Sequence, residues 1–466
     1  MSLRAEIARL APGDRLPSAR ELVRRHGVSP VTVTRAFALL AAEGAVVTRP
    51  GSGTFVAQPR AQPGTMPADT SWQAVALGDR SVDTARVSHL LGPPPPGAIT
   101  MSGGYLHRSL QPTRALAAAL ARASRRPDAW DRAPAQGLAP LRAVFARLAS
   151  AGPEDVLITG GGQGALSMAF RAIAPPGSPV LVESPTYPGA LSAARAAGLR
   201  SIPVPMDADG IRPDLLAETF AMTGARLLYC QPTFHNPTGA VLSLERRRQV
   251  VAVARASGAF VLEDDFARLL GHGGPTPRPL VADDHDGTVV YLTSLTKAAS
   301  PSLRIGALLA RGPVMARLRA MRLVDDFFVA RPLQEAAIEL VSTPTWDRHL
   351  RTLSTALRER CSTLAAALAE HVPQWRVAGV PAGGLHLWAE TDRAGNVGEM
   401  SRRCGVTVEP GQDFFAAEAP GQFVRLGFAA VPDLADLVEG ARRLGSALEH
   451  RPRTSTSGMD DGLQGQ

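Results

Sequence analysis

The stretch that decides the fold is TSLTKAASPSLRIG (293–306), which follows the apolar run TVVYL (288–292) and carries Lys297. Lys297 is the single lysine in a chain of 466 residues, although Lys and Arg together number 50. Arginine can replace lysine in ion pairs and phosphate contacts, but its guanidinium stays protonated and cannot form a Schiff base. The position therefore indicates a lysine needed for covalent chemistry, or one that survived by chance.

The residues around Lys297 favour a phosphorylated cofactor. Ser294 lies three residues before it and Arg304 seven residues after it. A hydroxyl and a guanidinium can hold a phosphate whose carrier bonds to the amine, a description that fits pyridoxal 5′-phosphate (PLP). The PLP ring withdraws electrons while its pyridine nitrogen is protonated, so a carboxylate must face that nitrogen. Asp264 in LEDDF (262–266) is the candidate, although an aspartate taken alone at this position more often caps a turn.

Short apolar runs alternate with helical patterns before and after this stretch. Such alternation is typical of an α/β fold with a mostly parallel sheet and helices on both faces. The residues from 312 to 448 are mainly helical, with strands near LHLW (385–388) and FVRLGF (423–428), and predict a smaller C-terminal lobe. The predicted strands are 156–159, 179–183, 226–230, 259–264, 288–292 and 305–310, and the helical patterns are 163–173, 188–197, 212–222 and 243–257.

More candidate groups follow the carboxyl ends of these strands. ITGGGQGAL (158–166) opens a helix, so the backbone N–H groups near Gly162 and Gln163 can bind a phosphate. Tyr187 in ESPTYPG could stack on the pyridine ring, and Asn236 in HNPTG could donate to its phenolic oxygen. Each group alone is compatible with ordinary packing or turn chemistry. Together they lie at the edge where open α/β sheets bind ligands.

From about residue 100 to residue 448, the chain resembles the fold-type-I aminotransferases of the aspartate aminotransferase class. The matching motifs, in family order, are GGGQGAL, ESPTYPG, HNPTG, LEDDF, SLTKAASPSLRIG, AGGLHLW (382–388), EPGQDF (409–414) and FVRLGF. The resemblance implies a Schiff base at Lys297, with Asp264 at the pyridine nitrogen, Asn236 at the phenolic oxygen and Tyr187 over the ring. It also implies a phosphate site made by Ser294, Arg304 and the backbone of Gly162 and Gln163, and a carboxylate of the substrate or effector at Arg425.

One position departs from this resemblance. The related sequences usually have tyrosine two residues after the pyridine-binding aspartate, where this chain has Phe266. A phenol there would share the phenolic oxygen of the cofactor with Asn236, so its loss changes the electronic properties of the cofactor. This departure bears on catalysis more than on cofactor binding.

The amino-terminal residues predict a basic helix-turn-helix with a wing. Residues 1–58 carry eight arginines against four acidic residues, which suggests a polyanionic partner, although charge alone fits a solvated basic face equally well. Ser18 can cap a helix that ends at Gly27, and Ser29 can cap a second helix with Pro30 in its first turn. On the second helix, Val33, Phe37 and Leu40 form the expected core stripe. VVTRPGSGTFV (46–56) then predicts two strands around a glycine hairpin.

This segment resembles the winged helix-turn-helix of GntR-family regulators. The similarity covers about 45 residues, including PGDRLPS, the helix with R-E-L, G-V-S and the wing GSGTFV. Pro30 departs from it, because family members often carry arginine there, and a winged helix used only for protein contacts is the alternative. The resemblance implies contacts with DNA phosphates and base edges at Arg20, Ser29, Thr32, Thr34, Arg35 and Gly53.

Composition bears on the location of the protein and on its domain boundaries. No apolar stretch reaches the length of a membrane span, and three cysteines make no disulfide framework, so we expect a cytoplasmic protein without a metal site. The predicted domains are a DNA-binding domain (1–58), a linker (59–97), a PLP-binding domain (98–448) and a disordered tail (449–466).

The order of these domains resembles the MocR subfamily of GntR-type regulators. The resemblance implies a homodimeric transcriptional regulator that binds double-stranded operator DNA and PLP. The resemblance also implies that the regulator senses an amine, an amino acid or PLP itself. A working PLP-dependent aminotransferase with an accessory DNA-binding module is the alternative. A third hypothesis, a DNA-binding protein whose large domain has lost its cofactor, predicts replacement of Lys297 or Asp264, and both residues are present.

Overall fold

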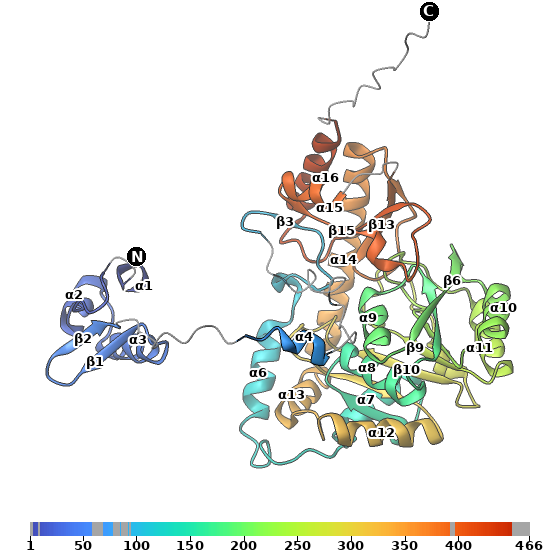
Figure 1. Cartoon of the computed structure of the whole chain (residues 1–466), viewed down its shortest axis with the longest axis horizontal. Coiled ribbons are helices and arrows are strands. Elements are labelled where there is room, and N and C mark those ends of the chain that lie inside the picture. The colour runs from blue at the N-terminus through green and yellow to red at the C-terminus, as the bar shows by residue number, and fades with distance from the viewer. Residues whose placement is uncertain are drawn as a thin grey trace, which may run out of the picture. The chain divides into compact units, whose positions relative to one another are not determined.

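The chain forms two compact units, Met1–Ser81 and Val82–Gln466 (Figure 1). The computed structural model describes residues 3–7, 10–57, 69–77, 84, 92, 95–391 and 397–449. The division between the units falls inside the segment 59–97. Most of that segment, and residues 450–466 of the predicted tail, lie outside the described residues.

The first unit contains the predicted helix pair and wing. Ser18 and Glu21 form a reciprocal capping box at the start of α2, and Gly27 ends this helix with φ 63°. The Ser29 side chain caps α3, which has Pro30 in its first turn. A further helix, α4, lies in the segment predicted as linker and was not expected from the sequence. The elements are α1 (Leu3–Ile7), α2 (Ala19–His26), α3 (Pro30–Ala42), β1 (Val46–Arg49), β2 (Gly53–Val56) and α4 (Trp72–Leu77).

The second unit is built on an eight-stranded mixed sheet. Five consecutive strands in the sheet, from β10 to β6, run parallel, whereas β11 is antiparallel to both of its neighbours and β7 is antiparallel to β6. In order across the sheet, the strands are β4 (Val156–Thr159), β11 (Gly306–Leu309), β10 (Val289–Ser294), β9 (Phe260–Asp264), β8 (Leu227–Cys230), β5 (Pro179–Ser184), β6 (Arg200–Asp207) and β7 (Gly210–Ile211).

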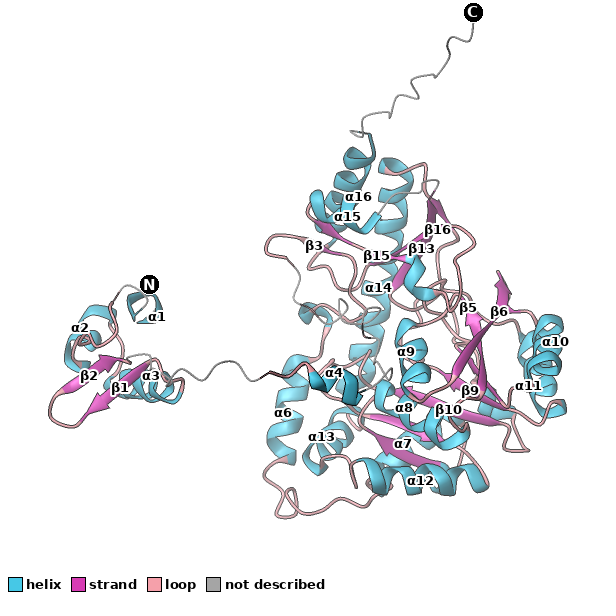
Figure 2. Ribbon diagram, viewed as in Figure 1, coloured by secondary structure: helices cyan, strands magenta, loops and turns pink. Residues whose placement is uncertain are grey.

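Helices cover both faces of this sheet, as predicted (Figure 2). Along β4, Val156 and Ile158 point into one core and Leu157 into the other, which is the alternation of a strand buried on both sides. One face carries α8 (Gly162–Ile173), α9 (Pro188–Ala196) and α12 (Pro313–Asp325). The other face carries α7 (Ala139–Ala149), α10 (Pro213–Thr223), α11 (Leu244–Ala256) and α13 (Arg331–Val341), and α6 (Thr113–Ala123) packs on α13.

A smaller lobe completes the second unit. Its antiparallel sheet has the order β12 (Arg376–Val377), β13 (His386–Thr391), β16 (Gln422–Gly427) and β15 (Glu409–Pro410). The long helix α14 (Pro344–His371) packs on α16 (Leu434–Glu449), and α15 (Val397–Arg403) lies beside the short parallel pair of β14 (Val406–Thr407) and β3 (Ile99–Thr100). Short 3-10 turns are η1 (Arg108–Leu110), η2 (Pro153–Asp155), η3 (Leu280–Asp283) and η4 (Gly411–Phe414).

Across the described part of the chain, every helix is too short or too polar to cross a membrane. The same residues contain no group of three or more His, Cys, Asp or Glu side chains arranged to hold a metal ion.

Candidate functional site

Lys297 follows β10 and lies in a largely enclosed position. Its Nζ donates a hydrogen bond to the carbonyl oxygen of Gly104 at 2.6 Å and lies 3.9 Å from the ring centre of Tyr105. Burial, together with the charge of Arg425, lowers the pKa of Lys297 to about 7. The amine can therefore be neutral near physiological pH, which is the form that attacks an aldehyde.

Asp264 ends β9 and has two different carboxylate oxygens. Its Oδ2 accepts hydrogen bonds from the Tyr229 hydroxyl at 2.7 Å and from Gln231 Nε2 at 3.2 Å. Its buried Oδ1 has no hydrogen-bond partner among the described residues. Burial raises the pKa of Asp264 to about 6, and the hydrogen bonds from Tyr229 and Gln231 oppose that rise. Asp264 thus keeps one acceptor oxygen available for a further N–H group.

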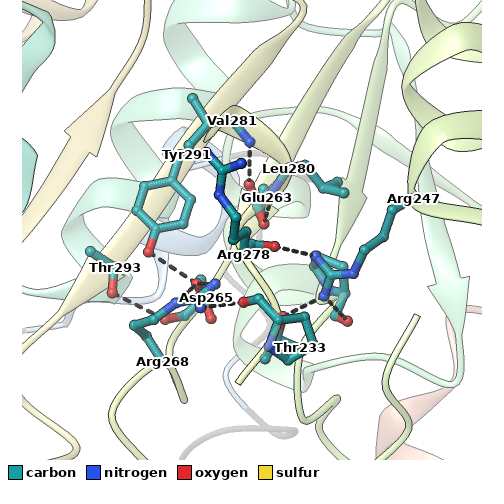
Figure 3. Close-up of polar contacts among 12 residues, drawn as sticks. Thr233, Arg247, Glu263, Asp265, Arg268, Arg278, Leu280, Val281, Tyr291 and Thr293 are labelled. Carbon is teal, nitrogen blue, oxygen red and sulfur yellow. Dashed lines mark hydrogen bonds and ion pairs between the residues drawn. The ribbon is translucent and has the colours of Figure 1, made fainter. Parts of the chain in front are cut away.

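A set of buried charges supports the end of β9 from the opposite face (Figure 3). Glu263 accepts hydrogen bonds from the backbone N–H groups of Leu280 and Val281, at 2.8 and 3.1 Å. Asp265 accepts from the Tyr291 hydroxyl at 3.0 Å and from Arg268 Nε at 2.5 Å. Successive side chains of a strand point to opposite faces, so these contacts fix the strand end while Asp264 points the other way.

An anion cradle forms where α8 begins. Gly161 caps this helix with φ 88°, and a Cβ built there would lie 2.8 Å from the guanidinium carbon of Arg304. Arg304 Nη2 donates to the carbonyl oxygen of Gly160 at 2.9 Å. Ser294 pairs with Gly306, whose own Cβ position lies 3.2 Å from the Cα of Gly161. The predicted phosphate residues are therefore neighbours at a helix amino terminus, which attracts anions.

Tyr187 and Gln163 are hydrogen-bonded to each other near the start of α8. The Tyr187 hydroxyl donates to Gln163 Oε1 at 3.2 Å, and Gln163 Nε2 donates to the carbonyl oxygen of Gly189 at 2.8 Å. Burial, together with Tyr105 and Asp264, raises the pKa of Tyr187 well above its usual value, so the phenol stays neutral. Tyr187 is the residue before α9, and its ring has a fixed orientation.

Arg425 and Asn236 come from β16 and from the loop after β8, and they meet inside the domain. Arg425 Nη1 donates to Asn236 Oδ1 at 2.9 Å, and Nη2 donates to the carbonyl oxygen of Ser102 at 3.0 Å. The amide orientation of Asn236 is thereby fixed, with its Nδ2 left for donation to another group. Burial lowers the pKa of Arg425, which nevertheless remains a buried cation. Both residues were predicted, and their mutual contact was not.

Four residues of this site were missed by the sequence reasoning: Tyr105, Tyr229, Gln231 and His386. Tyr229 lies in the apolar run RLLYC, where an aromatic residue predicts core packing. Gln231 and His386 gave a usable signal, because a polar side chain just after a strand, or inside the apolar motif AGGLHLW, is unusual. Gln231 also links two predicted residues, since its Oε1 accepts from the backbone N–H of Asn236 at 3.2 Å while its Nε2 contacts Asp264.

The candidate nucleic-acid residues gather on the first unit. Arg20, Ser29, Thr32, Thr34 and Arg35 are exposed. Of the three predicted core positions on α3, Val33 and Leu40 are buried, whereas Phe37 is only half-buried.

Local contacts of these residues also shape the helix and the wing. Ser29 Oγ accepts from the Thr32 N–H at 3.1 Å, and Thr34 donates to the carbonyl oxygen of Pro30 at 3.0 Å. Gly53, at the start of the second wing strand, has φ 115°, and its Cβ position lies 2.9 Å from Arg15 Nε.

Comparisons with known proteins match both units. The family described as aminotransferase class I and II matches residues 101–444, and the gntR family of bacterial regulatory proteins matches residues 2–56. A 2-aminoadipate transaminase of Thermus thermophilus is 33% identical over 362 residues, covering 76% of this chain and 91% of that protein. The HTH-type transcriptional regulator TauR of Rhodobacter capsulatus is 30% identical over 470 residues, covering 94% of this chain and 93% of TauR.

A solved structure agrees with these matches. The crystal structure of LysN, an alpha-aminoadipate aminotransferase from Thermus thermophilus, superposes with a TM-score of 0.74 at 31% identity. The superposition covers 79% of this chain and 95% of LysN, which was complexed with N-(5'-phosphopyridoxyl)-L-leucine.

Proposed function

Because this chain belongs to the aminotransferase class I and II family and begins with a gntR-family domain, we propose that it is a PLP-dependent DNA-binding transcriptional regulator of the MocR type. Its large domain senses an amine, an amino acid or PLP itself. The observation that carries the proposal is that Lys297, Asp264 and Arg304 lie at adjoining ends of the neighbouring strands β10, β9 and β11, in a chain that also has a winged helix-turn-helix. TauR, named as a regulator, matches across both parts.

The residues present fit PLP. Because Gly161 has no Cβ, the Arg304 guanidinium can lie directly against the amino terminus of α8, and the two together suit a phosphate. The unpartnered Oδ1 of Asp264 suits a protonated pyridine nitrogen. Asn236 Nδ2 is available for the phenolic oxygen because Arg425 occupies the amide oxygen.

Each side chain then has a separate task. When bound, PLP supplies an aldehyde that captures amines and a ring that withdraws electrons. Lys297 holds the cofactor covalently, and its lowered pKa keeps part of the amine neutral for that bond. Ser294, Arg304 and the backbone of Gly162 and Gln163 hold the phosphate, and Tyr187 stacks on the ring. Arg425 binds the carboxylate of an amino-acid effector.

The winged helix reads DNA in this proposal. Arg20, Arg35 and the wing at Gly53 contact phosphates, and the exposed face of α3 with Thr32 and Thr34 enters the major groove. The effector changes DNA binding only through different affinities for two arrangements of the DNA-binding domains.

We also propose a cytoplasmic homodimer. Val324 at the end of α12, Phe327 after it and Trp130 in the loop after α6 are exposed by 81%, 67% and 77%. An ion pair between Asp128 and Arg331 links the Trp130 loop to the start of α13, four residues after Phe327. Large apolar side chains gathered at a surface favour an interface, here with a second copy of the chain.

The second candidate function is a working aminotransferase. Lys297, Asp264 and Arg425 are all present, and the 33% identical relative is a transaminase. Against this candidate, Phe266 packs against the core and offers no hydroxyl, so Asn236 alone would donate to the phenolic oxygen. The complete helix-turn-helix also favours regulation.

Absorption spectra separate the two functions. Purified protein with PLP is followed while amino acids and amines are added. A shifted cofactor band that persists is the result expected for a sensor. Rapid conversion to the pyridoxamine form, reversed by a keto acid, would instead identify an enzyme. A protein that gains no bound-PLP band would overturn the cofactor assignment.

A further inference from the structure

His386 is a buried polar residue outside the proposed cofactor contacts. It begins β13, is 6% exposed, and its Nε2 has no hydrogen-bond partner among the described residues. A buried nitrogen without a partner costs free energy, so its retention needs a reason.

The ring of His386 faces the same space as Lys297. A carbon built as the Cβ of Gly104 would lie 3.6 Å from Lys297 Nζ and 3.9 Å from His386 Nε2. One atom-sized position is thus within 4 Å of both groups. Gly427, which pairs with His386, has no room for a side chain, because its Cβ position lies 2.7 Å from the carbonyl oxygen of Gly103.

His386 also shares a sheet face with the carboxylate-binding candidate. Arg425 on β16 pairs with Trp388, which is two residues after His386 on β13. Residues two apart on a strand point to the same face, so His386 and Arg425 are diagonal neighbours. The charges of Arg425 and Lys297 both act on His386, so the amine, the guanidinium and the imidazole are neighbours.

His386 has a hydrogen-bond acceptor on the side of its ring that is near Lys297. Burial and the charges of Arg425 and Lys297 hold the pKa of His386 well below its usual value, so the ring is neutral. A neutral imidazole has one donor and one acceptor nitrogen. The ring forms a hydrogen bond with the backbone of Gly103. Because Nε2 has no partner among the described residues, this bond involves Nδ1 as the donor, and Nε2 is the acceptor nitrogen.

We propose that His386 selects the effector: its Nε2 accepts a hydrogen bond from an O–H or N–H group on the side chain of an amino acid whose carboxylate Arg425 binds. This inference rests on the proposed sensing function. The amine of the ligand is committed to the cofactor, so the donor must be a second polar group. An apolar side chain of the same size leaves Nε2 buried and unpaired, and such a site discriminates strongly against it.

The test uses the full-length protein loaded with PLP and pairs of L-amino acids of matched size. The pairs are 2-aminobutyrate with serine, and norvaline with homoserine. Dissociation constants come from the visible spectrum and, independently, from calorimetry. His386→Phe removes the acceptor and keeps a buried ring, while His386→Gln keeps an acceptor. His272→Phe is the matched control. His272 is also buried, with an Nε2 that has no partner among the described residues. Its pKa, however, is lowered by burial and by the charge of Arg358, and not by the charges of Lys297 and Arg425.

We expect the wild type and His272→Phe to bind the donor-bearing member of at least one pair about tenfold more tightly than its apolar partner. The preference should fall to within about twofold in His386→Phe and be partly retained in His386→Gln. A preference that survives in His386→Phe would overturn the proposal. So would a wild type that binds PLP but shows no preference in any pair. Failure to bind PLP before any amino acid is added would count against the proposed function itself.

Discussion

Asp264 depends on two neighbours for its charge at neutral pH. Burial raises its pKa to about 6, and the hydroxyl of Tyr229 opposes this rise. In Tyr229→Phe the pKa of Asp264 rises further, so more of the carboxyl is protonated at pH 7 and cannot pair with a pyridinium. We expect PLP to bind about tenfold more weakly at pH 7, with the difference shrinking towards pH 9, where both proteins are ionised.

Equilibrium dialysis of PLP at several pH values measures this effect. Tyr291→Phe is the matched control, since it removes an equally buried hydroxyl that donates to Asp265 and not to Asp264. Equal PLP affinities of the wild type and Tyr229→Phe at pH 7 would contradict the role given to Tyr229.

The covalent bond between Lys297 and PLP can be tested by a single substitution, because the chain has no other lysine. Borohydride reduction should trap PLP on the wild type and leave no adduct on Lys297→Ala, as measured by intact-protein mass. Because the pKa of Lys297 is lowered to about 7, adduct formation in the wild type should accelerate between pH 6 and pH 8 as the amine loses its proton. A trapped adduct that persists in Lys297→Ala refutes the assignment.

Sequence patterns could identify the residues with distinctive chemistry and not those that support them. Lys297 is unique, and Asp264 and Asn236 lie in recognisable motifs. Tyr229 lies in an apolar strand, where nothing local distinguishes a core tyrosine from one that donates to a carboxylate on the next strand. That contact depends on the pairing of β8 with β9, which is a property of the folded sheet.

Among the elements, the start of α8 depends on one glycine. Gly161 has φ 88°, and a Cβ there would lie 2.8 Å from Arg304. Gly161→Ala should strain the turn and displace the guanidinium, so PLP affinity should fall by about tenfold or more. Gly164→Ala, in the same helix with nothing within 4 Å of its Cβ position, should leave PLP affinity unchanged in the same titration. Loss of affinity in both variants would show that the helix as a whole, and not the cradle, is sensitive.

In the large sheet, hydrophobic periodicity predicts the positions of most strands but not their directions. All six strands predicted between residues 156 and 310 exist. The run 305–310 did not indicate a direction, and β11 is antiparallel to both β10 and β4. β6 was not predicted at all, because RSIPVPMD contains two prolines, which usually argue against a strand. β6 is the penultimate strand of the sheet. It pairs in parallel with β5 over residues 200–205 and then in antiparallel with β7.

For the whole molecule, charge predicts how DNA binding responds to salt. The first 58 residues have twice as many arginines as acidic residues. Affinity for an operator selected from a random duplex pool should fall steeply between about 50 and about 200 mM salt. In Arg35→Ala the slope of log affinity against log salt should decrease by about one, as one phosphate contact is lost. Affinity independent of salt, measured by fluorescence anisotropy, would reject this DNA interface.

The proposed homodimer can be tested by a substitution at Val324. Val324 is 81% exposed and, in the proposal, is covered by a second copy of the chain. Val324→Asp would place a charge in that apolar contact, so sedimentation should show a shift from dimer towards monomer. Because a dimer brings two DNA-binding domains to one operator, operator affinity should fall at least about tenfold, through lost avidity. Met222→Asp, at a residue 77% exposed on α10, should change neither quantity. A Val324→Asp protein that remains dimeric would place the interface elsewhere.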